Sequence, residues 1–89
     1  MAYIWDEAKR QSNLQKHKLD FADAYRIFEG VTFTFEDERF EYDEPRYVTI
    51  GQLEIIVVVV VHTDRNGDIR IISMRKASKH EQKLYRESF

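Results

Sequence analysis

Basic side chains gather in the last third of the chain, where their types and spacing suit phosphate binding. Arg70 lies inside an alternating apolar segment, and Arg75-Lys76 follow where that segment ends. A guanidinium group matches phosphate geometry with two parallel hydrogen bonds, so these side chains are candidates for binding a phosphodiester. In a regular strand Arg70 shares a face with Ile72 and Met74, and Arg75 points to the other face. Salt bridges to acidic neighbours, or solvation on an exposed sheet face, would explain the same residues without a ligand.

Five further residues combine useful chemistry with ordinary structural explanations. Arg46 heads a predicted strand directly after Glu44 and the only proline. His62 ends a predicted strand, and His17 lies at a helix C-terminus, where the helix dipole alone favours it. Tyr85 falls on the last predicted helix, where an aromatic ring usually packs into the core. Each of these residues is a candidate for a phosphate, base or substrate contact, and each also fits a purely structural role.

Composition excludes several classes of site. The chain has no cysteine, which removes disulfides, thiolate nucleophiles and cysteine-ligated zinc. The three histidines lack metal-ligand spacing, and residues 36–44 lack the glycine and regular oxygen ligands of a calcium loop. No glycine-rich phosphate loop is present. We therefore predict neither a metal ion nor a cofactor.

Length and charge suggest one small, electrically polarised domain. We assign all of residues 1–89 to it, because the chain is too short for a second core. The net charge is −2, yet residues 29–46 carry seven acidic and two basic side chains, whereas residues 62–89 carry seven basic and four acidic ones. The longest apolar run, residues 55–61, falls far short of the about 20 residues that span a membrane. With no signal-peptide pattern, we expect a cytoplasmic protein without a membrane partner.

Two helices are predicted near the N-terminus. Asp6 is a good N-cap for a helix that runs to about His17, and residues 2–5 before it form a short apolar lead-in compatible with a strand. Asp20 caps a second helix that ends at Gly30. Its apolar residues recur at helical spacing on one face, namely Phe21, Ala24, Tyr25 and Phe28.

The remainder predicts four strands and a last helix. The strands are residues 31–35, 46–50, 53–63 and 69–74, and the acidic residues 36–44 between the first two form an exposed loop or ragged hairpin. The third strand is apolar at both parities and should be central, and Asn66-Gly67 predicts a hairpin after it. Ser78 and Glu81 have capping-box spacing for a helix to about Glu87. This order predicts an α+β fold: two N-terminal helices, a four-stranded mainly antiparallel sheet and a C-terminal helix, with the helices on one face.

Three segments, in order, make the chain resemble the BrnT toxins. The first comprises Ile4-Trp5-Asp6, Lys9, Asn13, Lys16-His17, Phe21, Ala24 and Phe28. The second is Arg46-Tyr47-Val48-Thr49-Ile50-Gly51. The third is Arg70-Ile71-Ile72-Ser73-Met74-Arg75-Lys76-Ala77, followed by Glu81 and Tyr85. The chain departs from the usual family pattern at Lys18, where a glycine is common, and at Glu44-Pro45-Arg46, where an acid more often directly precedes the arginine.

The resemblance implies a RelE-like microbial ribonuclease fold and a toxin of a type II toxin–antitoxin pair that inhibits translation and growth. Such enzymes cut RNA without a metal, by attack of the 2′-OH on the adjacent phosphate. On that basis Arg70 and Arg75 would stabilise the transition-state charge, and Arg46 would make a second phosphate contact. The base is open among Glu44, His62 and His17. The candidates for substrate binding are Lys76, Tyr85, His62 and His17.

The resemblance also implies a partner. BrnT-like toxins pair with an antitoxin that carries a ribbon-helix-helix DNA-binding domain, and operator DNA is contacted only through that antitoxin. An alternative from the residues is a non-catalytic module that holds an antitoxin or RNA, or an inactive relic of the toxin. RNA cleavage in EDTA discriminates between these possibilities.

Overall fold

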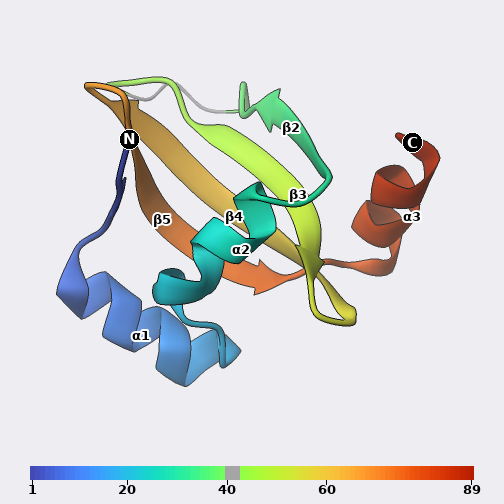
Figure 1. The fold of residues 1–89 in the computed structure, drawn as a ribbon, viewed down its shortest axis with the longest axis horizontal. Helices are drawn as coiled ribbons and strands as arrows, with labels where there is room; N and C mark the ends of the chain where they lie inside the picture. Colours follow the sequence, from blue (N-terminus) through green and yellow to red (C-terminus); the bar gives the residue numbers. More distant parts are fainter. Residues whose placement is uncertain (40–42) are drawn as a thin grey trace.

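The computed structural model describes residues 1–39 and 43–89 and shows an α+β fold in which helices pack around a central sheet (Figure 1). The elements follow one another as β1 (Tyr3–Ile4), α1 (Glu7–His17), the 3-10 helix η1 (Phe21–Asp23), α2 (Ala24–Phe28), β2 (Thr32–Glu36), β3 (Tyr47–Leu53), β4 (Ile56–Arg65), β5 (Asp68–Lys76) and α3 (Lys79–Glu87).

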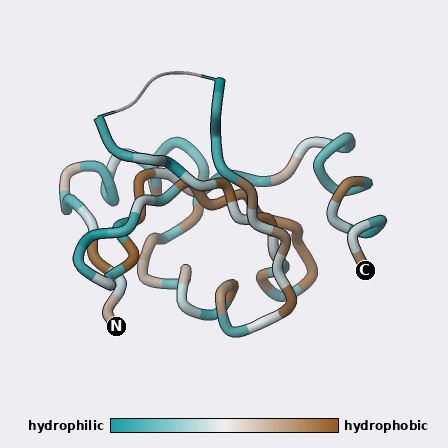
Figure 2. The backbone as a smooth tube through the Cα atoms, turned by 90° about the horizontal axis from the view of Figure 1, so that it is seen from above, coloured by the Kyte–Doolittle hydropathy of each residue, from teal (hydrophilic) through white to brown (hydrophobic). Residues whose placement is uncertain are grey.

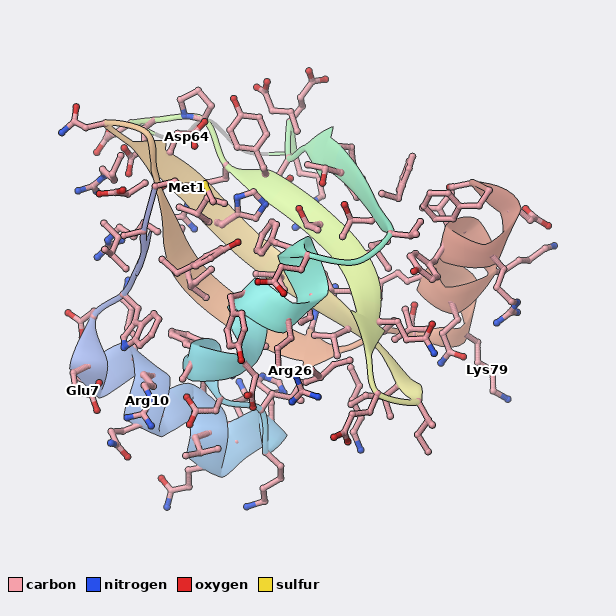
Figure 3. All side chains as sticks on the ribbon, viewed as in Figure 1. Met1, Glu7, Arg10, Arg26, Asp64 and Lys79 are labelled. Carbon is pink, nitrogen blue, oxygen red and sulfur yellow. The ribbon has the colours of Figure 1, made fainter. Side chains whose placement is uncertain are left out.

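The first helix begins and ends as its sequence predicts. The Asp6 side chain accepts a hydrogen bond from the Lys9 N–H, and α1 ends at His17. Lys18 then adopts the left-handed conformation, with φ of 61°, which explains why a glycine is common at this position. Arg10, which Figure 3 labels on α1, joins this helix to the next turn, because its guanidinium donates to both Asp20 oxygens at 2.7 and 2.9 Å.

Asn13 fastens α1 to the sheet. Its amide donates to the Leu19 carbonyl at 3.1 Å, and its Oδ1 accepts from the Met74 N–H of β5 at 3.1 Å. The side chain is buried, so both polar ends are satisfied by backbone groups. The contact occupies a stretch of the β5 edge that β1 does not reach.

The second helix is shorter than predicted. The single helix expected after Asp20 is the three-residue η1 followed by the five-residue α2. Phe21, Ala24 and Ile27 are fully buried, whereas Tyr25, assigned to the apolar face, is 45% exposed. The periodicity predicted the buried positions of Phe21 and Ala24 correctly. It placed Tyr25 on the same face because it assumed a continuous α-helix, whereas the segment begins as a 3-10 helix, which has fewer residues per turn.

The sheet has five strands, not four, in the order β1-β5-β4-β3-β2. The additional strand β1 pairs parallel with β5 through Tyr3–Ile69 and Ile4–Arg70, and all other pairings are antiparallel. This strand lies within residues 2–5, the apolar lead-in that was compatible with a strand, and it is held in the sheet by its pairing with β5. The Asn66-Gly67 turn joins β4 to β5 as predicted, with φ of 54° and 89°.

The boundary between β3 and β4 also differs from the prediction. Gly51 does not stop β3, which continues to Leu53, and the turn falls at Glu54 and Ile55. A Cβ on Gly51 would lie 2.6 Å from Cγ2 of Ile27, so the glycine permits α2 to approach the sheet closely. The residue was interpreted as a strand stop, but its role is packing.

Helices cover both faces of the sheet, not one as predicted. Val58 and Val60 of β4 pack in a core with residues of η1 and α2, whereas Val59 packs on the other side with Ile50 and with Leu84 of α3. The alternation along β4 explains its apolar run, because both parities are buried. The predicted central position of this strand is confirmed.

Part of the acidic segment 36–44 belongs to the sheet or extends it. Glu36 belongs to β2, and the Asp37 N–H donates to the Arg46 carbonyl at 2.8 Å, which extends the β2–β3 hairpin. Residues 40–42 of the predicted loop lie outside the described residues. Figure 2 shows hydrophilic residues on both sides of that gap and hydrophobic ones along the strands. Among the helices in the described ranges, none is long and apolar enough to cross a membrane.

Candidate active site

A β-bulge brings Arg70 and Arg75 to the same face of the sheet. Val61 pairs with Ser73 and His62 with Ile71, so Ile72 is an extra residue in β5. Arg70 therefore lies opposite Thr63, and Arg75 opposite Val59. Thr63 and Val59 are four residues apart on β4 and share a face. The expectation of opposite faces, which assumed a regular strand, is wrong.

Arg46 belongs to the same face by alternation. It directly precedes β3, two residues before Val48, and Val48 pairs with Val61. We call the sheet face that carries Arg46, Arg70 and Arg75 the arginine face. α3 packs on one end of it, over Ile50 and Val59. Four residues of β4 separate the rows of Arg70 and Arg75, which corresponds to about 13 Å along the strand.

Arg75 is held by the first turn of α3. Its Nη1 and Nη2 atoms donate to the two carboxylate oxygens of Glu81 at 2.7 and 2.8 Å. Glu81 also accepts from the Ser78 N–H at 2.8 Å, which completes the predicted capping box. The Arg75 hydrogen bonds, together with the cap, lower the pKa of Glu81 to about 2. The carboxylate is thus ionised at neutral pH and fixes the orientation of the guanidinium.

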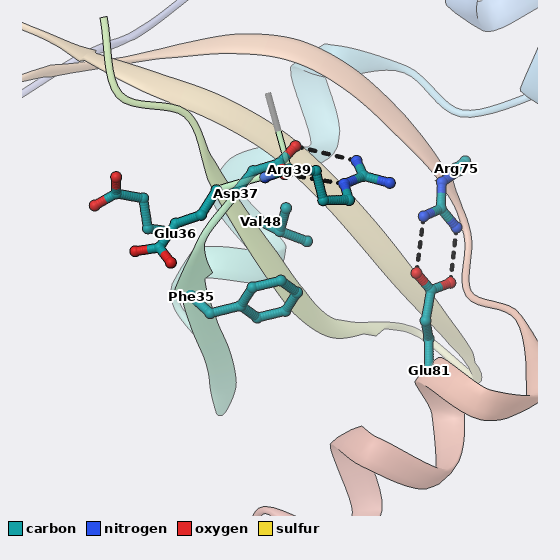
Figure 4. A pocket seen from close by; sticks show the side chains of 8 residues that line it. Phe35, Glu36, Asp37, Arg39, Val48, Arg75 and Glu81 are labelled. Atoms are coloured by element: carbon teal, nitrogen blue, oxygen red, sulfur yellow. Dashed lines mark hydrogen bonds and ion pairs between the residues drawn. The ribbon is translucent and has the colours of Figure 1, made fainter. Parts of the chain in front are cut away.

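A cavity of about 230 Å³ opens beside this pair (Figure 4). Phe35 and Val48 line it, together with a second ion pair in which Arg39 Nε and Nη2 each lie 3.0 Å from an Asp37 oxygen. The Asp37 side chain is only 4% exposed, whereas that of Arg39 is 74% exposed. Sequence reasoning missed Arg39. A signal existed, because Arg39 and Arg46 are the only basic residues in the acidic segment 29–46.

Glu44 lies at the Arg70 end of the arginine face. Its carboxylate accepts three hydrogen bonds of 2.8 to 3.1 Å from Arg65, at the end of β4. The Arg65 hydrogen bonds lower the pKa of Glu44, and the charges of Arg65 and Arg70 lower it further. Glu44, Arg65 and Arg70 therefore form one charged cluster. Arg65 was also missed, although it stands beside the Asn66-Gly67 turn that returns the chain to Arg70.

Comparison with protein families assigns the chain. The description that matches is a ribonuclease toxin, BrnT, of a type II toxin-antitoxin system, and the match covers residues 5–81. The chain belongs to the BrnT family. It is a ribonuclease toxin whose system supplies an antitoxin partner, as the sequence resemblance implied. Comparison with curated proteins gave no match. The matched range includes Arg46, Arg70, Arg75 and Glu81 and ends before Tyr85.

His62 of this BrnT chain lies on the opposite face, buried below α2. Its Nε2 is 2.7 Å from the Thr49 hydroxyl, which is 2.8 Å from the Thr34 hydroxyl, and its ring packs edge-on against Phe28 at 5.0 Å. Burial lowers the pKa of His62 to about 4. Its Nδ1 is buried without a hydrogen-bond partner. The histidine is therefore neutral at physiological pH and separated from the arginines by the sheet.

The structure does not bring the other predicted substrate-binding residues to the arginine cluster. The Tyr85 hydroxyl donates to the Val31 carbonyl at 2.8 Å and ties α3 to the start of β2. Lys76 is exposed and, being adjacent to Arg75 in β5, falls on the alternate face. His17 lies in the last turn of α1. Within residues 1–39 and 43–89, no group of three or more histidine or acidic side chains is placed to hold a metal ion.

Proposed function

We propose that this BrnT toxin cuts single-stranded RNA on its arginine face, without a metal, by attack of the 2′-OH on the adjacent phosphate. The observation that carries the proposal is the bulge at Ile72, because it puts Arg70 and Arg75 on one face. In this reaction the 2′-oxygen bonds to phosphorus and the bond to the 5′-oxygen breaks. The products are a 2′,3′-cyclic phosphate and a 5′-hydroxyl, which takes up a proton.

The arginines would stabilise the charge that develops on the phosphorane. A fixed guanidinium aimed at a developing oxyanion acts most strongly where water is partly excluded. Arg75 is already fixed by Glu81, and its side chain is 42% exposed, so it is oriented yet reachable. The rows of Arg70 and Arg75 are about 13 Å apart along the strand. The two side chains would therefore reach the RNA phosphate from opposite sides. Arg46 supplies a further phosphate contact on the same face.

We assign the general base to Glu44. Among Glu44, His62 and His17, only the glutamate clusters with a residue of the arginine face, because Arg70 is close enough to lower its pKa. The carboxylate is ionised at neutral pH and can accept the proton of the 2′-OH, while the hydrogen bonds from Arg65, which lower its pKa, make it a weaker base than a free glutamate. His62 is buried on the other face, and Tyr85, Lys76 and His17 have the structural positions described above. We therefore leave these four residues out of the proposed site.

We further infer a RelE-like ribonuclease fold and an antitoxin with a ribbon-helix-helix domain. The order of helices, antiparallel strands and a final helix supports the fold. The family supports the antitoxin, through which operator DNA would be contacted. The cytoplasm, where bacterial messenger RNA is translated, is the expected place of action, and loss of translation and growth the expected effect.

The direct test is cleavage of end-labelled single-stranded RNA by the purified toxin in EDTA. We expect cleavage with 2′,3′-cyclic phosphate ends. Binding without cleavage would instead support a non-catalytic module, and cleavage only after a divalent cation is restored would contradict the metal-independent mechanism. RNA in which every 2′-OH is methylated is the matched control, because it lacks the proposed nucleophile and must stay intact.

A further inference from the structure

The two edges of the sheet differ in how they are covered. At one edge, β1 pairs with Ile69 and Arg70 of β5, and the Asn13 side chain accepts a hydrogen bond from the Met74 N–H. At the other edge β2 is the last strand, and no strand in the described ranges pairs with its outer side (Figure 1). An open edge presents backbone N–H and C=O groups on which a further strand can add.

Apolar side chains of β2 and α3 gather along this open edge. We call them the edge patch: Val31, Phe33, Phe35, Tyr85 and Phe89. The rings of Phe33 and Phe35 lie 5.7 Å apart, and those of Tyr85 and Phe89 lie 5.2 Å apart. The Tyr85 hydroxyl joins the two halves through the Val31 carbonyl at 2.8 Å. Val31, Phe35 and Phe89 are 60%, 40% and 65% exposed, and an exposed apolar patch of this kind is typical of a protein contact.

Acidic side chains border the edge patch at both ends of β2. Glu36 and Glu38, at its end, are exposed and form no ion pair with any described residue. Glu54, 73% exposed, lines a hollow with Val31 and Tyr85 near its start. A second copy pairing antiparallel along β2 would bring Glu36 of each copy towards Glu54 of the other, and like charges destabilise such a pairing. Phosphates are repelled as well, so the acids favour a protein segment with basic ends over RNA or a second copy.

We propose that the antitoxin docks by adding an extended segment to the outer edge of β2. This inference rests on the antitoxin partner of the proposed function and is independent of where the RNA is cut. Main-chain hydrogen bonds to β2 hold the added segment, and alternate side chains give it specificity. Apolar side chains two residues apart in the segment lie on Phe33 and Phe35, and basic side chains at its ends face Glu36 and Glu54.

Hydrogen–deuterium exchange of the toxin, alone and with the antitoxin encoded beside it, tests the added strand directly. We expect the amides of β2 that face outwards to exchange at least about tenfold more slowly in the complex, because they gain backbone partners. The amides of α2, which packs on the opposite face, should keep their rates. Protection elsewhere in the toxin with unchanged exchange in β2 would overturn the proposal.

Titration of the fluorescently labelled antitoxin tests the side chains. We expect Phe35→Ala to weaken binding about tenfold, because it removes an apolar contact. Glu36→Lys, at an exposed position, should weaken binding about threefold or more at low salt, and it keeps the test decisive if Phe35→Ala fails to fold. Tyr25→Ala is the matched control, because Tyr25 is an aromatic residue of similar exposure on α2, and it should bind as the parent does.

The outcomes separate this inference from the proposed function. Parent-like binding by both Phe35→Ala and Glu36→Lys overturns the docking surface, whether or not the toxin cuts RNA. A loss in Tyr25→Ala equal to that of Phe35→Ala also overturns it, because the effect would then not belong to the β2 edge. A parent that fails to bind the antitoxin removes the inferred partner together with its docking surface. A parent that binds through β2 but does not cut RNA removes the cleavage mechanism alone.

Discussion

At the scale of single residues, the site is defined by which carboxylate each arginine meets. Arg75 meets Glu81, Arg39 meets Asp37, and Arg65 meets Glu44. Residue types alone made the arginines candidates for phosphate binding, but they could not show which carboxylate each arginine contacts. The pairs involve partners 2, 6 and 21 residues apart, and only the last requires two distant elements to meet. Local spacing would have sufficed for the first two.

The assignment of Glu44 as the base predicts a particular pH profile. Its pKa lies below the ordinary value of 4.5 because of Arg65, so the carboxylate stays ionised throughout the neutral range. We expect single-turnover cleavage to be flat between about pH 5 and 8, and Glu44→Gln to lose at least about 100-fold. Single-turnover cleavage by Glu44→Gln at pH 7 measures the loss of rate. An acid limb centred near pH 6.5 would point instead to a histidine base.

The burial of His62 predicts that the free energy of unfolding depends on pH. Its folded pKa of about 4 lies below the unfolded value of about 6.5, because burial disfavours the charged ring. Between these values only the unfolded chain binds the proton, so the free energy of unfolding must fall as the pH drops from about 6.5 to 4. Urea titrations across this window should show the slope in the parent and a flatter dependence in His62→Gln. A histidine proton resonance of His62 that titrates near pH 6.5 in the folded protein would refute the burial argument.

At the scale of elements, contacts between strands and helices determine which face a residue of β5 lies on and where β3 ends, and the sequence pattern alone predicted neither correctly. The alternation of β5 predicted the faces of its residues correctly only as far as Ile71, because the extra residue Ile72 reverses the parity. Periodicity assumes regular geometry, and no residue type in this segment marks a bulge. Likewise Gly51 was interpreted as a strand end, although its missing side chain makes room for Ile27.

Gly51→Ala should therefore destabilise the fold. The added Cβ would lie 2.6 Å from Ile27 and 3.2 Å from Thr32, in a core that cannot relax freely. Overpacking of this kind costs about 1–3 kcal/mol, measurable by urea unfolding. Gly30→Ala is the matched control, since its Cβ would meet nothing closer than 3.6 Å, and it should change stability little. Equal stability of the two variants would show that α2 does not press on β3 as described.

Glu81 joins α3 to the site, and its two roles can be separated. Glu81→Gln keeps an oxygen for the Ser78 N–H but loses the charged pair with Arg75, whereas Ser78→Ala weakens the cap and leaves the pair. We expect the glutamine variant to lose about tenfold in the rate of cleavage with little change in stability. The alanine variant should lose about 1 kcal/mol of stability at an unchanged rate. Equal losses of cleavage rate in Glu81→Gln and Ser78→Ala would mean that α3 affects cleavage only through the stability of the fold.

At the scale of the whole molecule, the order of elements and the central position of β4 followed from the sequence, but the layering did not. The apolar run of β4 includes residues of both strand faces, so the sequence predicted that both faces of this strand are covered. The apolar pattern could not show that α3 would pack on the second face, because that depends on the path of the two-residue link Ala77-Ser78 between β5 and α3. α3 therefore covers the end of the arginine face that carries Ile50 and Val59.

The proposed mechanism requires that Arg70 and Arg75, on one face of the sheet, both contribute to RNA cleavage by this BrnT toxin. The most direct measurement is the single-turnover cleavage rate of Arg70→Ala and Arg75→Ala in EDTA. Arg26→Ala is the control, because Arg26 is an exposed arginine of α2 with only long ion pairs of 3.4 and 3.7 Å. We predict losses of at least about 100-fold in each of the first two variants and none in the control. Parent-like rates in both Arg70→Ala and Arg75→Ala would show that these arginines do not carry the cleavage.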